Sequence, residues 1–218
     1  MTQSKQLITF KNICLNFKNK NIFENFNFVI NSGEKVVVFG KSGTGKSTLL
    51  NLILGFKQAD SGQIIFNDQE INSQNIFEIR KQIAYIDQDV MMGEGKVEKI
   101  IAEYFSFVAN SQKQFTATEM TELLETFGLD SNILKKDIGQ ISGGEKQRLA
   151  VVVALLLKRP VMILDEITSS LDPASKTIVI KELLKNSQST ILIITHDEEW
   201  QHQKNVRIFD FKEKKWKQ

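Results

Sequence analysis

The stretch VVVFGKSGTGKST, from Val36 to Thr48, decides the fold that the sequence predicts. A run of valines leads into a loop of the form G-x-x-x-x-G-K-[ST], and the apolar segment TLLNLILGF continues as a helix. Such a loop folds its backbone around phosphate groups, because glycines permit the tight path and N–H groups at a helix N-terminus attract negative charge. A glycine-rich turn can match this pattern by accident, but the flanking strand and helix make that alternative weak.

Nine consecutive residues form the predicted phosphate loop. They are Gly40, Lys41, Ser42, Gly43, Thr44, Gly45, Lys46, Ser47 and Thr48. We expect Lys46 to contact the β- and γ-phosphates of a nucleoside triphosphate, and the hydroxyl of Ser47 to ligate Mg²⁺. The sequence therefore predicts a nucleotide site in this loop.

Two later apolar runs, Val161–Leu164 and Ile191–Thr195, have the same character as Val36–Phe39. Continuous runs of this kind suit strands buried on both faces, as in a parallel sheet covered by helices. Residues 7 to 30 alternate roughly and predict antiparallel strands, whereas residues 89 to 155 predict helices. The predicted fold class is therefore α/β, with a mainly parallel central sheet, an N-terminal antiparallel β region and a helical insertion.

Composition indicates a soluble globular protein. Of the 218 residues, 41% are hydrophobic and 25% are charged, with a mean hydropathy of −0.20. The net charge of +2 is too small to indicate nucleic acid or an anionic membrane as a partner. The longest apolar run, Leu149 to Leu157, is well short of the ~20 residues that span a bilayer, and the N-terminus shows no signal region. With Cys14 as the lone cysteine, we expect a cytoplasmic protein that binds no nucleic acid and does not insert into the membrane.

The motif VMILDE places two carboxylates directly after a buried strand. Asp165 at the strand end would be costly to bury unless a cation or hydrogen bonds met it, and Mg²⁺ in a nucleotide site is such a cation. We expect Glu166 to project into the same space, where a carboxylate can orient and deprotonate the attacking water. A second interpretation, in which Glu166 only favours the N-terminus of a following helix, is less favoured.

Gln88 and His196 also follow apolar strands. Taken alone, each would be a hydrogen-bonded polar residue at a strand end. At a sheet edge shared with the phosphate loop, both become candidates to contact the γ-phosphate or its attacking water, and Gln88 also becomes a candidate Mg²⁺ ligand. His202 lies in a polar stretch, and we expect it to be solvated.

A second glycine-containing motif, ISGGE, opens a helix-forming segment at residues 141 to 145. Ser142 and Glu145 form a capping box, which does not require two glycines between them. Gly143 and Gly144 would let a phosphate approach the bare helix N-terminus closely. Because the chain already has one phosphate loop, the phosphate here would belong to a nucleotide held by another copy of the protein.

These motifs together resemble the ATP-binding subunits of ABC transporters over essentially the full length of the chain. GKSGTGKS resembles the phosphate loop, Gln88 the Q-loop, ISGGE the signature motif and VMILDE the second Walker motif. SSLD, from Ser169 to Asp172, resembles the D-loop, and His196 the switch histidine. Six motifs in the order of the family are far more specific than any one match.

The resemblance implies a P-loop NTPase fold of ABC type and a homodimer that sandwiches two ATP molecules head to tail, each with Mg²⁺. The signature of one subunit would cap the γ-phosphate held by the other, with Ser142 donating across the interface. It also implies a separate integral membrane permease as partner, and a location on the inner face of the cell membrane. The whole chain would be one ATPase domain, with a RecA-like core at 1–88 and 156–218 and a helical subdomain at 89–155.

The resemblance extends to one aromatic residue and includes two departures. Alignment of ITFKNICLNF with the family's first strands implies that Phe17 stacks on adenine, although a core position for Phe17 stays equally open. Glu145 replaces the Gln common in the signature, and Ile167 stands where many importer subunits carry Pro. The form DEITSSLD resembles exporters, and the segment from residue 131 to 172 resembles a bacterial Fet-type iron-export group, although no His or Cys cluster indicates an iron site.

Two alternatives stay open at this point. The chain could be a non-transport ABC ATPase that acts in cofactor assembly or cell division. The segment MMGEGKVEK, residues 91 to 99, could dock the permease or could be a plain exposed loop.

Overall fold

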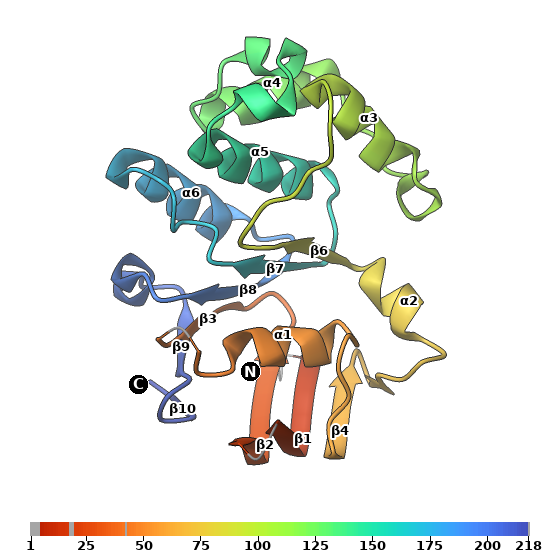
Figure 1. The fold of residues 1–218 in the computed structure, drawn as a ribbon, viewed down its shortest axis with the longest axis vertical. Coiled ribbons are helices and arrows are strands. Elements are labelled where there is room, and N and C mark those ends of the chain that lie inside the picture. The colour runs from red at the N-terminus through yellow and green to blue at the C-terminus, as the bar shows by residue number, and fades with distance from the viewer. Residues whose placement is uncertain (1–4, 18–19, 42, 218) are drawn as a thin grey trace.

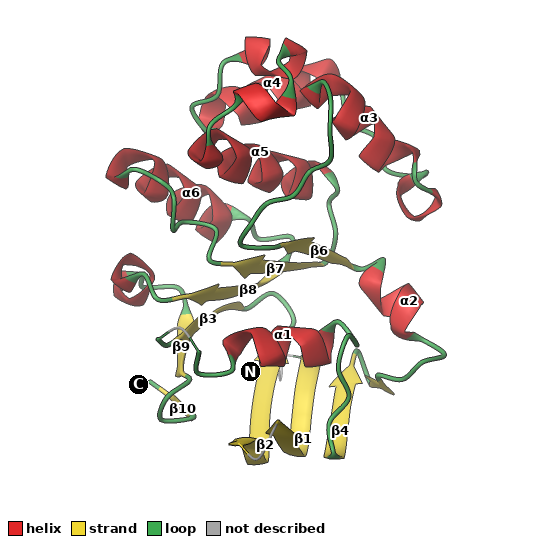
Figure 2. Cartoon of the chain, viewed as in Figure 1, coloured by secondary structure: helices red, strands yellow, loops and turns green. Residues whose placement is uncertain are grey.

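The computed structural model describes residues 5–17, 20–41 and 43–217 of the 218-residue chain. Most of its α-helices lie over one face of a six-stranded sheet, and a smaller antiparallel sheet lies at the opposite end (Figure 1; Figure 2). The strands are β1 Gln6–Phe17, β2 Lys20–Asn31, β3 Lys35–Phe39, β4 Ser61–Phe66, β5 Gln69–Glu70, β6 Ile83–Ile86, β7 Val161–Asp165, β8 Thr190–Thr195, β9 Arg207–Asp210 and β10 Lys215–Trp216. The predicted fold class is confirmed.

The central sheet has the strand order β10-β9-β3-β8-β7-β6. Four neighbouring pairs, from β9 through β6, are parallel, and only β10 pairs antiparallel, with β9. The smaller sheet has the order β2-β1-β4-β5 and is antiparallel throughout. The alternating residues near the N-terminus therefore form β1 and β2 as predicted.

Two hydrophobic clusters pack against opposite faces of the central sheet. On β7, Met162 and Leu164 belong to the cluster under the helices, whereas Val161 and Ile163 belong to the cluster shared with the antiparallel sheet. The same alternation continues on β3 and β8, because successive side chains of a strand point to opposite faces. The apolar runs read from the sequence are thus buried on both sides.

The helices divide between these two faces. The α-helices are α1 Lys46–Ile53, α2 Ile76–Arg80, α3 Val97–Ser106, α4 Ala117–Thr126, α5 Gly143–Leu156 and α6 Pro173–Lys185. Short 3-10 helices occupy Val108–Asn110, Ser131–Lys135, Ile138–Gln140 and Glu198–His202. Helix α1 lies between the two sheets, and α5 and α6 lie over the other face of the central sheet with α3 and α4 beyond them (Figure 1).

The predicted helical segment at 89–155 contains α3, α4 and all but the last residue of α5. Helix α4 begins with a capping box, in which Thr116 accepts from the backbone of Glu119 and Glu119 accepts from that of Thr116. The division of the chain into a core and a helical subdomain stays a prediction. Among the described residues, none of the helices has the length and apolar character needed to cross a bilayer.

Candidate active site

Segments far apart in the sequence meet around one pocket of about 350 Å³. The carboxyl ends of β3, β6 and β7 lie at the same edge of the parallel sheet, which is where ligands bind in open α/β sheets. The pocket is lined by Phe17, Ile22, Gly43, Gly45, Lys46, Ser47, Thr48, Gln88, Asp165 and Glu166. The structure thus brings together most of the predicted site residues of the described chain, and adds Ile22, which no sequence motif indicated.

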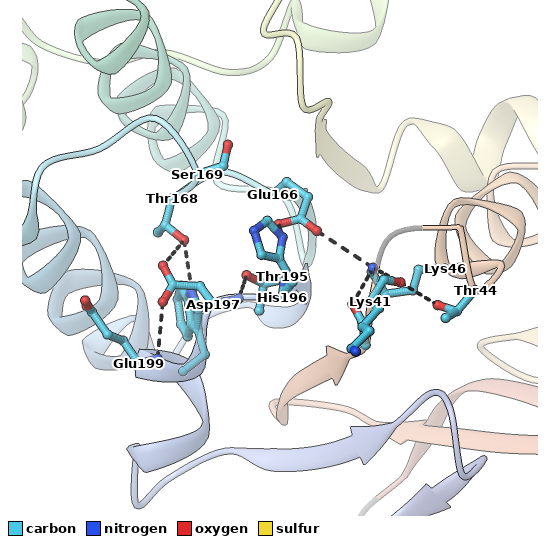
Figure 3. Close-up of polar contacts among 12 residues, drawn as sticks. Lys41, Thr44, Lys46, Glu166, Thr168, Ser169, Thr195, His196, Asp197 and Glu199 are labelled. Atoms are coloured by element: carbon cyan, nitrogen blue, oxygen red, sulfur yellow. Dashed lines mark hydrogen bonds and ion pairs between the residues drawn. The ribbon is translucent and has the colours of Figure 1, made fainter.

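Lys46 is buried at the first position of α1. Its ammonium donates to the carbonyl oxygens of Gly40 at 2.6 Å and Lys41 at 3.0 Å, and it lies 3.8 Å from a carboxylate oxygen of Glu166 (Figure 3). Burial lowers the pKa of Lys46, while the charges of Glu166 and Asp165 act to raise it. The chain therefore holds a cation at the floor of the pocket.

The phosphate loop leaves room for a ligand beside the backbone of Gly43. Gly43 has a φ of +77°, and a Cβ there would meet no atom within 4 Å. Gly45, at a φ of +106°, caps α1, which has no side-chain cap and no acidic residue in its first turn. Gly40, Lys41 and Thr44 support the loop without lining the pocket, and Ser42 lies outside the described residues. This arrangement fits an anion at the N-terminus of α1.

Asp165, the last residue of β7, is 6% exposed. Burial, with the nearby carboxylates of Glu166 and Asp87, raises the pKa of Asp165 to about 6, against the opposing charge of Lys46. A carboxylate in such surroundings favours a cation partner. Ser47 and Gln88 line the same pocket, and hydroxyl, amide and carboxylate oxygens are the donors that Mg²⁺ takes together with substrate phosphates. These residues therefore fit the predicted metal.

Glu166 adopts a backbone conformation that non-glycine residues rarely take, with a φ of +52°. Its carboxylate oxygen Oε2 lies 2.8 Å from Nδ1 of His196 and 3.4 Å from the His196 backbone nitrogen (Figure 3). Helix α6 begins only at Pro173, with Asp172 as its N-cap. The interpretation of Glu166 as a residue that favours the start of the next helix is therefore wrong.

The structure places His196 and Gln88 at the predicted strand ends, directly after β8 and two residues after β6. The His196 side chain is 61% exposed beyond Glu166, and Gln88 forms part of the pocket wall. The roles of His196 and Gln88 stay predictions, but both residues lie near the phosphate loop.

Phe17 lies at the end of β1 and is 52% exposed. It lines the pocket, and the ammonium of Lys57 lies 4.4 Å from the centre of its ring. The alternative position in the core is wrong, because other phenylalanines of this region, such as Phe10 and Phe28, fill the core instead. Adenine stacking by Phe17 stays a prediction.

The signature segment does not line this pocket. Ser142 caps α5, with its hydroxyl accepting from the backbone of Glu145 at 3.2 Å and the Glu145 carboxylate accepting from the backbone of Ser142 at 2.7 Å. These contacts lower the pKa of Glu145. The predicted capping box is confirmed.

The two glycines of the signature have different surroundings. A Cβ on Gly144 would lie 3.3 Å from the carbonyl oxygen of Ser170 and 3.4 Å from Cδ2 of Leu171, so packing within the chain restricts this position. A Cβ on Gly143 would meet nothing within 4 Å. No sequence motif indicates the internal reason for Gly144, because Ser170 lies far along the chain. The described residues give no such reason for Gly143.

The chain is similar in sequence to known proteins. The family model described as ABC transporter matches residues 23–169. The chain is 36% identical over 203 residues to the ergothioneine transport ATP-binding protein EgtV of Helicobacter pylori (strain G27), covering 89% of this chain and 92% of that protein. It is 32% identical over 204 residues to an ATP-dependent lipid A-core flippase of Xanthomonas oryzae pv. oryzae (strain MAFF 311018). There the match covers 90% of this chain, and the chain spans only 34% of the flippase.

Solved structures share the fold. CbiO1 from Clostridium perfringens, part of the ABC transporter complex CbiONQ, superposes with a TM-score of 0.78 at 24% identity, covering 98% of this chain and 88% of that one. The dimeric structure of MJ0796, a bacterial ABC transporter cassette, gives a TM-score of 0.80 at 22% identity and covers 94% of each chain.

Proposed function

Because the chain belongs to the ABC transporter ATP-binding family, we propose that it binds and hydrolyses ATP with Mg²⁺ in a head-to-tail pair of copies and powers a separate membrane permease. One observation carries the proposal. The phosphate loop, Asp165 and Glu166 share one pocket, whereas the N-terminus of α5, with its two glycines, lies outside it. The chain supplies two complementary halves of a site that two copies would complete.

The proposed reaction transfers the γ-phosphoryl group of ATP to water. The loop N–H groups and Lys46 bind the phosphates, and Ser47, Gln88 and Asp165 would hold Mg²⁺, which neutralises phosphate charge when bound. The Glu166 carboxylate accepts a proton from the water as its oxygen bonds to the γ-phosphorus and the bond to the β–γ bridging oxygen breaks. His196 holds Glu166 in place through its Nδ1 contact. The products are ADP and phosphate.

A groove beside the Q-loop supports the permease as partner. It has a volume of about 490 Å³ and lies between the end of β6 and the helices α3 and α5. Its lining includes Met91, Met92 and Phe107, of which Met91 is 89% exposed and Phe107 49% exposed. Exposed apolar surface of this kind favours a protein partner. The proposal therefore assigns docking to this groove and to the segment 91–99, on the cytoplasmic face of the membrane.

We further propose that the permease selects the cargo and that transport runs outward, with metal export suggested only by the Fet-type resemblance. No group of three or more His, Cys, Asp or Glu that could hold a metal occurs in the ranges that the structure describes. The relatives by name move different cargoes, ergothioneine and lipid A-core, and this agrees with selection by the permease.

The test of hydrolysis is Glu166→Gln. General-base catalysis contributes about 10²- to 10⁴-fold, so we expect steady-state phosphate release to fall by at least about 100-fold while ATP binding persists. Glu198→Gln, at an exposed carboxylate two residues after His196, is the matched control and should keep full activity. Hydrolysis by Glu166→Gln at a near-normal rate would remove Glu166 from the role of base.

The head-to-tail pair is tested by mixing two inactive variants. A Lys46→Ala copy paired with a Ser142→Arg copy forms one site that carries both changes and one intact site, so the mixture should regain hydrolysis that neither variant has alone. Copurification with an integral membrane protein tests the permease. Failure of the mixture to regain activity, or to dimerise with ATP, would contradict the pair.

A further inference from the structure

A buried polar cluster lies behind the proposed catalytic pair. The Thr168 hydroxyl donates to Oδ2 of Asp197 at 3.2 Å (Figure 3). Lys176 Nζ lies 2.7 Å from the same oxygen. The other carboxylate oxygen of Asp197 accepts from the backbone of Glu199 at 3.2 Å, and Trp200 Nε1 donates to the Thr168 hydroxyl at 3.3 Å. No residue of this cluster lines the nucleotide pocket.

The cluster joins two loops that carry the reacting groups. Thr168 lies two residues after Glu166 at the end of β7, and Asp197 directly follows His196 at the end of β8. Across these loops, the Glu166 carboxylate contacts both Nδ1 and the backbone nitrogen of His196. The loops are therefore joined twice, once at the pocket and once behind it.

Burial makes the second junction rigid. Thr168 is 1% exposed and Trp200 is fully buried, and the Asp197 side chain is 13% exposed. Hydrogen bonds to an ionised carboxylate are stronger than neutral ones, and a buried network whose members are paired restricts motion. The Asp197 backbone nitrogen also donates to the hydroxyl of Thr195 at 2.9 Å, which fixes the turn that leaves β8.

The backbone of Glu166 requires such support. A φ of +52° in a non-glycine residue is unfavourable and persists only where the surroundings fix it. On one side, the Glu166 backbone nitrogen donates to the carbonyl of Ile194 at 2.9 Å. On the other side, Thr168 is the first downstream residue whose side chain bonds to the neighbouring loop. Loss of that bond would free the segment that aims the carboxylate.

We infer that Asp197, acting through Thr168, is a positioning residue for hydrolysis, which sets the placement of the Glu166 carboxylate against His196. The inference rests on the proposed ATPase function. Asp197 touches neither nucleotide nor water in this scheme. Its effect is on the rate of the chemical step, because a small misplacement of a catalytic group slows reaction far more than it weakens substrate binding.

Thr168→Val and Thr168→Ser form the matched pair of variants. Valine removes the hydroxyl with little change in shape, whereas serine keeps it. We expect Thr168→Val to lower kcat by about 10- to 100-fold with KM and ATP affinity within about two-fold of the wild type. Thr168→Ser should keep kcat within about three-fold. Asp197→Asn should lower kcat in the same way, and serves as the second variant if Thr168→Val does not fold.

Two further variants separate positioning from general stability. Trp200→Phe removes a donor to Thr168 without touching Asp197, so it should lower the melting temperature and leave kcat near the wild-type value. Thr168→Val added to Glu166→Gln should slow hydrolysis no further, because its effect acts through the missing carboxylate. Additive loss in that double variant would overturn the inference, as would a normal kcat in both Thr168→Val and Asp197→Asn.

The same data distinguish this inference from the proposed function. If Glu166→Gln leaves hydrolysis intact, the base assignment fails and the positioning role falls with it. If Glu166→Gln is slow but Thr168→Val and Asp197→Asn are as fast as the wild type, only the positioning role is refuted.

Discussion

Gly143→Ala should make the isolated chain more stable and the ATPase less active. Position 143 is the first residue of α5, and a methyl group there meets no atom of the described chain within 4 Å. Replacing glycine by alanine in a compatible helical position adds up to about 1 kcal/mol to the free energy of unfolding. In a protein of this length, that corresponds to a rise of roughly 2–4 °C in Tm.

The loss of activity follows from the proposed pair. There the new methyl would stand between the N-terminus of α5 and the γ-phosphate held by the partner copy. Loss of one hydrogen bond to a charged group costs about 1.5–3 kcal/mol, which is roughly a 10- to 150-fold loss in ATP-driven dimerisation and in hydrolysis. A gain in stability together with a loss of activity is the outcome that the head-to-tail pair predicts.

Gly144→Ala is the matched comparison. Its methyl would lie 3.3 Å from the carbonyl oxygen of Ser170, tighter than an ordinary contact, so crowding offsets the helical gain. We expect its Tm to lie below that of Gly143→Ala. Thermal unfolding without nucleotide, phosphate release and gel filtration with ATP give the three readouts. Full hydrolysis by Gly143→Ala, or a lowered Tm for that variant, would refute the reasoning.

Three other predictions concern the pocket wall, the loop support and the buried cluster. Phe17→Ala should weaken ATP binding by about 2- to 12-fold, which is the contribution of an aromatic stack, while Phe17→Tyr should keep the wild-type affinity. Equal affinities of the wild type and both variants for ATP, measured by calorimetry, would contradict stacking. Phe211→Ala should lower the free energy of unfolding, measured by urea denaturation, by about 3–5 kcal/mol. It should also weaken ATP binding, because this buried ring lies under Gly45 of the phosphate loop. A loss of less than about 1 kcal/mol would contradict the packing role of Phe211. Burial acts to raise the pKa of Asp197, but Lys176 and the other hydrogen-bond donors lower it overall, so the ionised form stabilises the fold at neutral pH. The stability that Asp197→Asn loses at pH 7 should therefore shrink as pH falls below about 4, and a difference independent of pH would count against that ionised contact.

The sequence was most informative where the signal is local. The phosphate loop predicted its own strand and helix, because the glycine pattern, the valine run and the helix that follows are all contiguous. The capping box at Ser142 was likewise readable from four residues. Buried strands such as Val161–Asp165 were recognisable from unbroken apolar runs.

The rest depends on contacts between distant segments. The position of β3 between β8 and β9 is set by packing on both sheet faces, which no local pattern encodes. The crowding of Gly144 by Ser170 and the bond between Thr168 and Asp197 also join residues of separate loops. Phe17 was ambiguous because an aromatic residue at a strand end suits a core or a pocket equally well, and only the three-dimensional arrangement decides.

The alternating burial of the central strands has a consequence for how this protein tolerates change. A slip of β7 by one residue relative to its neighbouring strands would send Met162 and Leu164 to the opposite face and turn Asp165 away from the loop. The hydrophobic cluster on each face of β7 opposes this slip independently. Substitutions in the core on one face of β7 can therefore accumulate while packing on the other face keeps the strand in register. The position of the Asp165 carboxylate thus tolerates changes of sequence in the core.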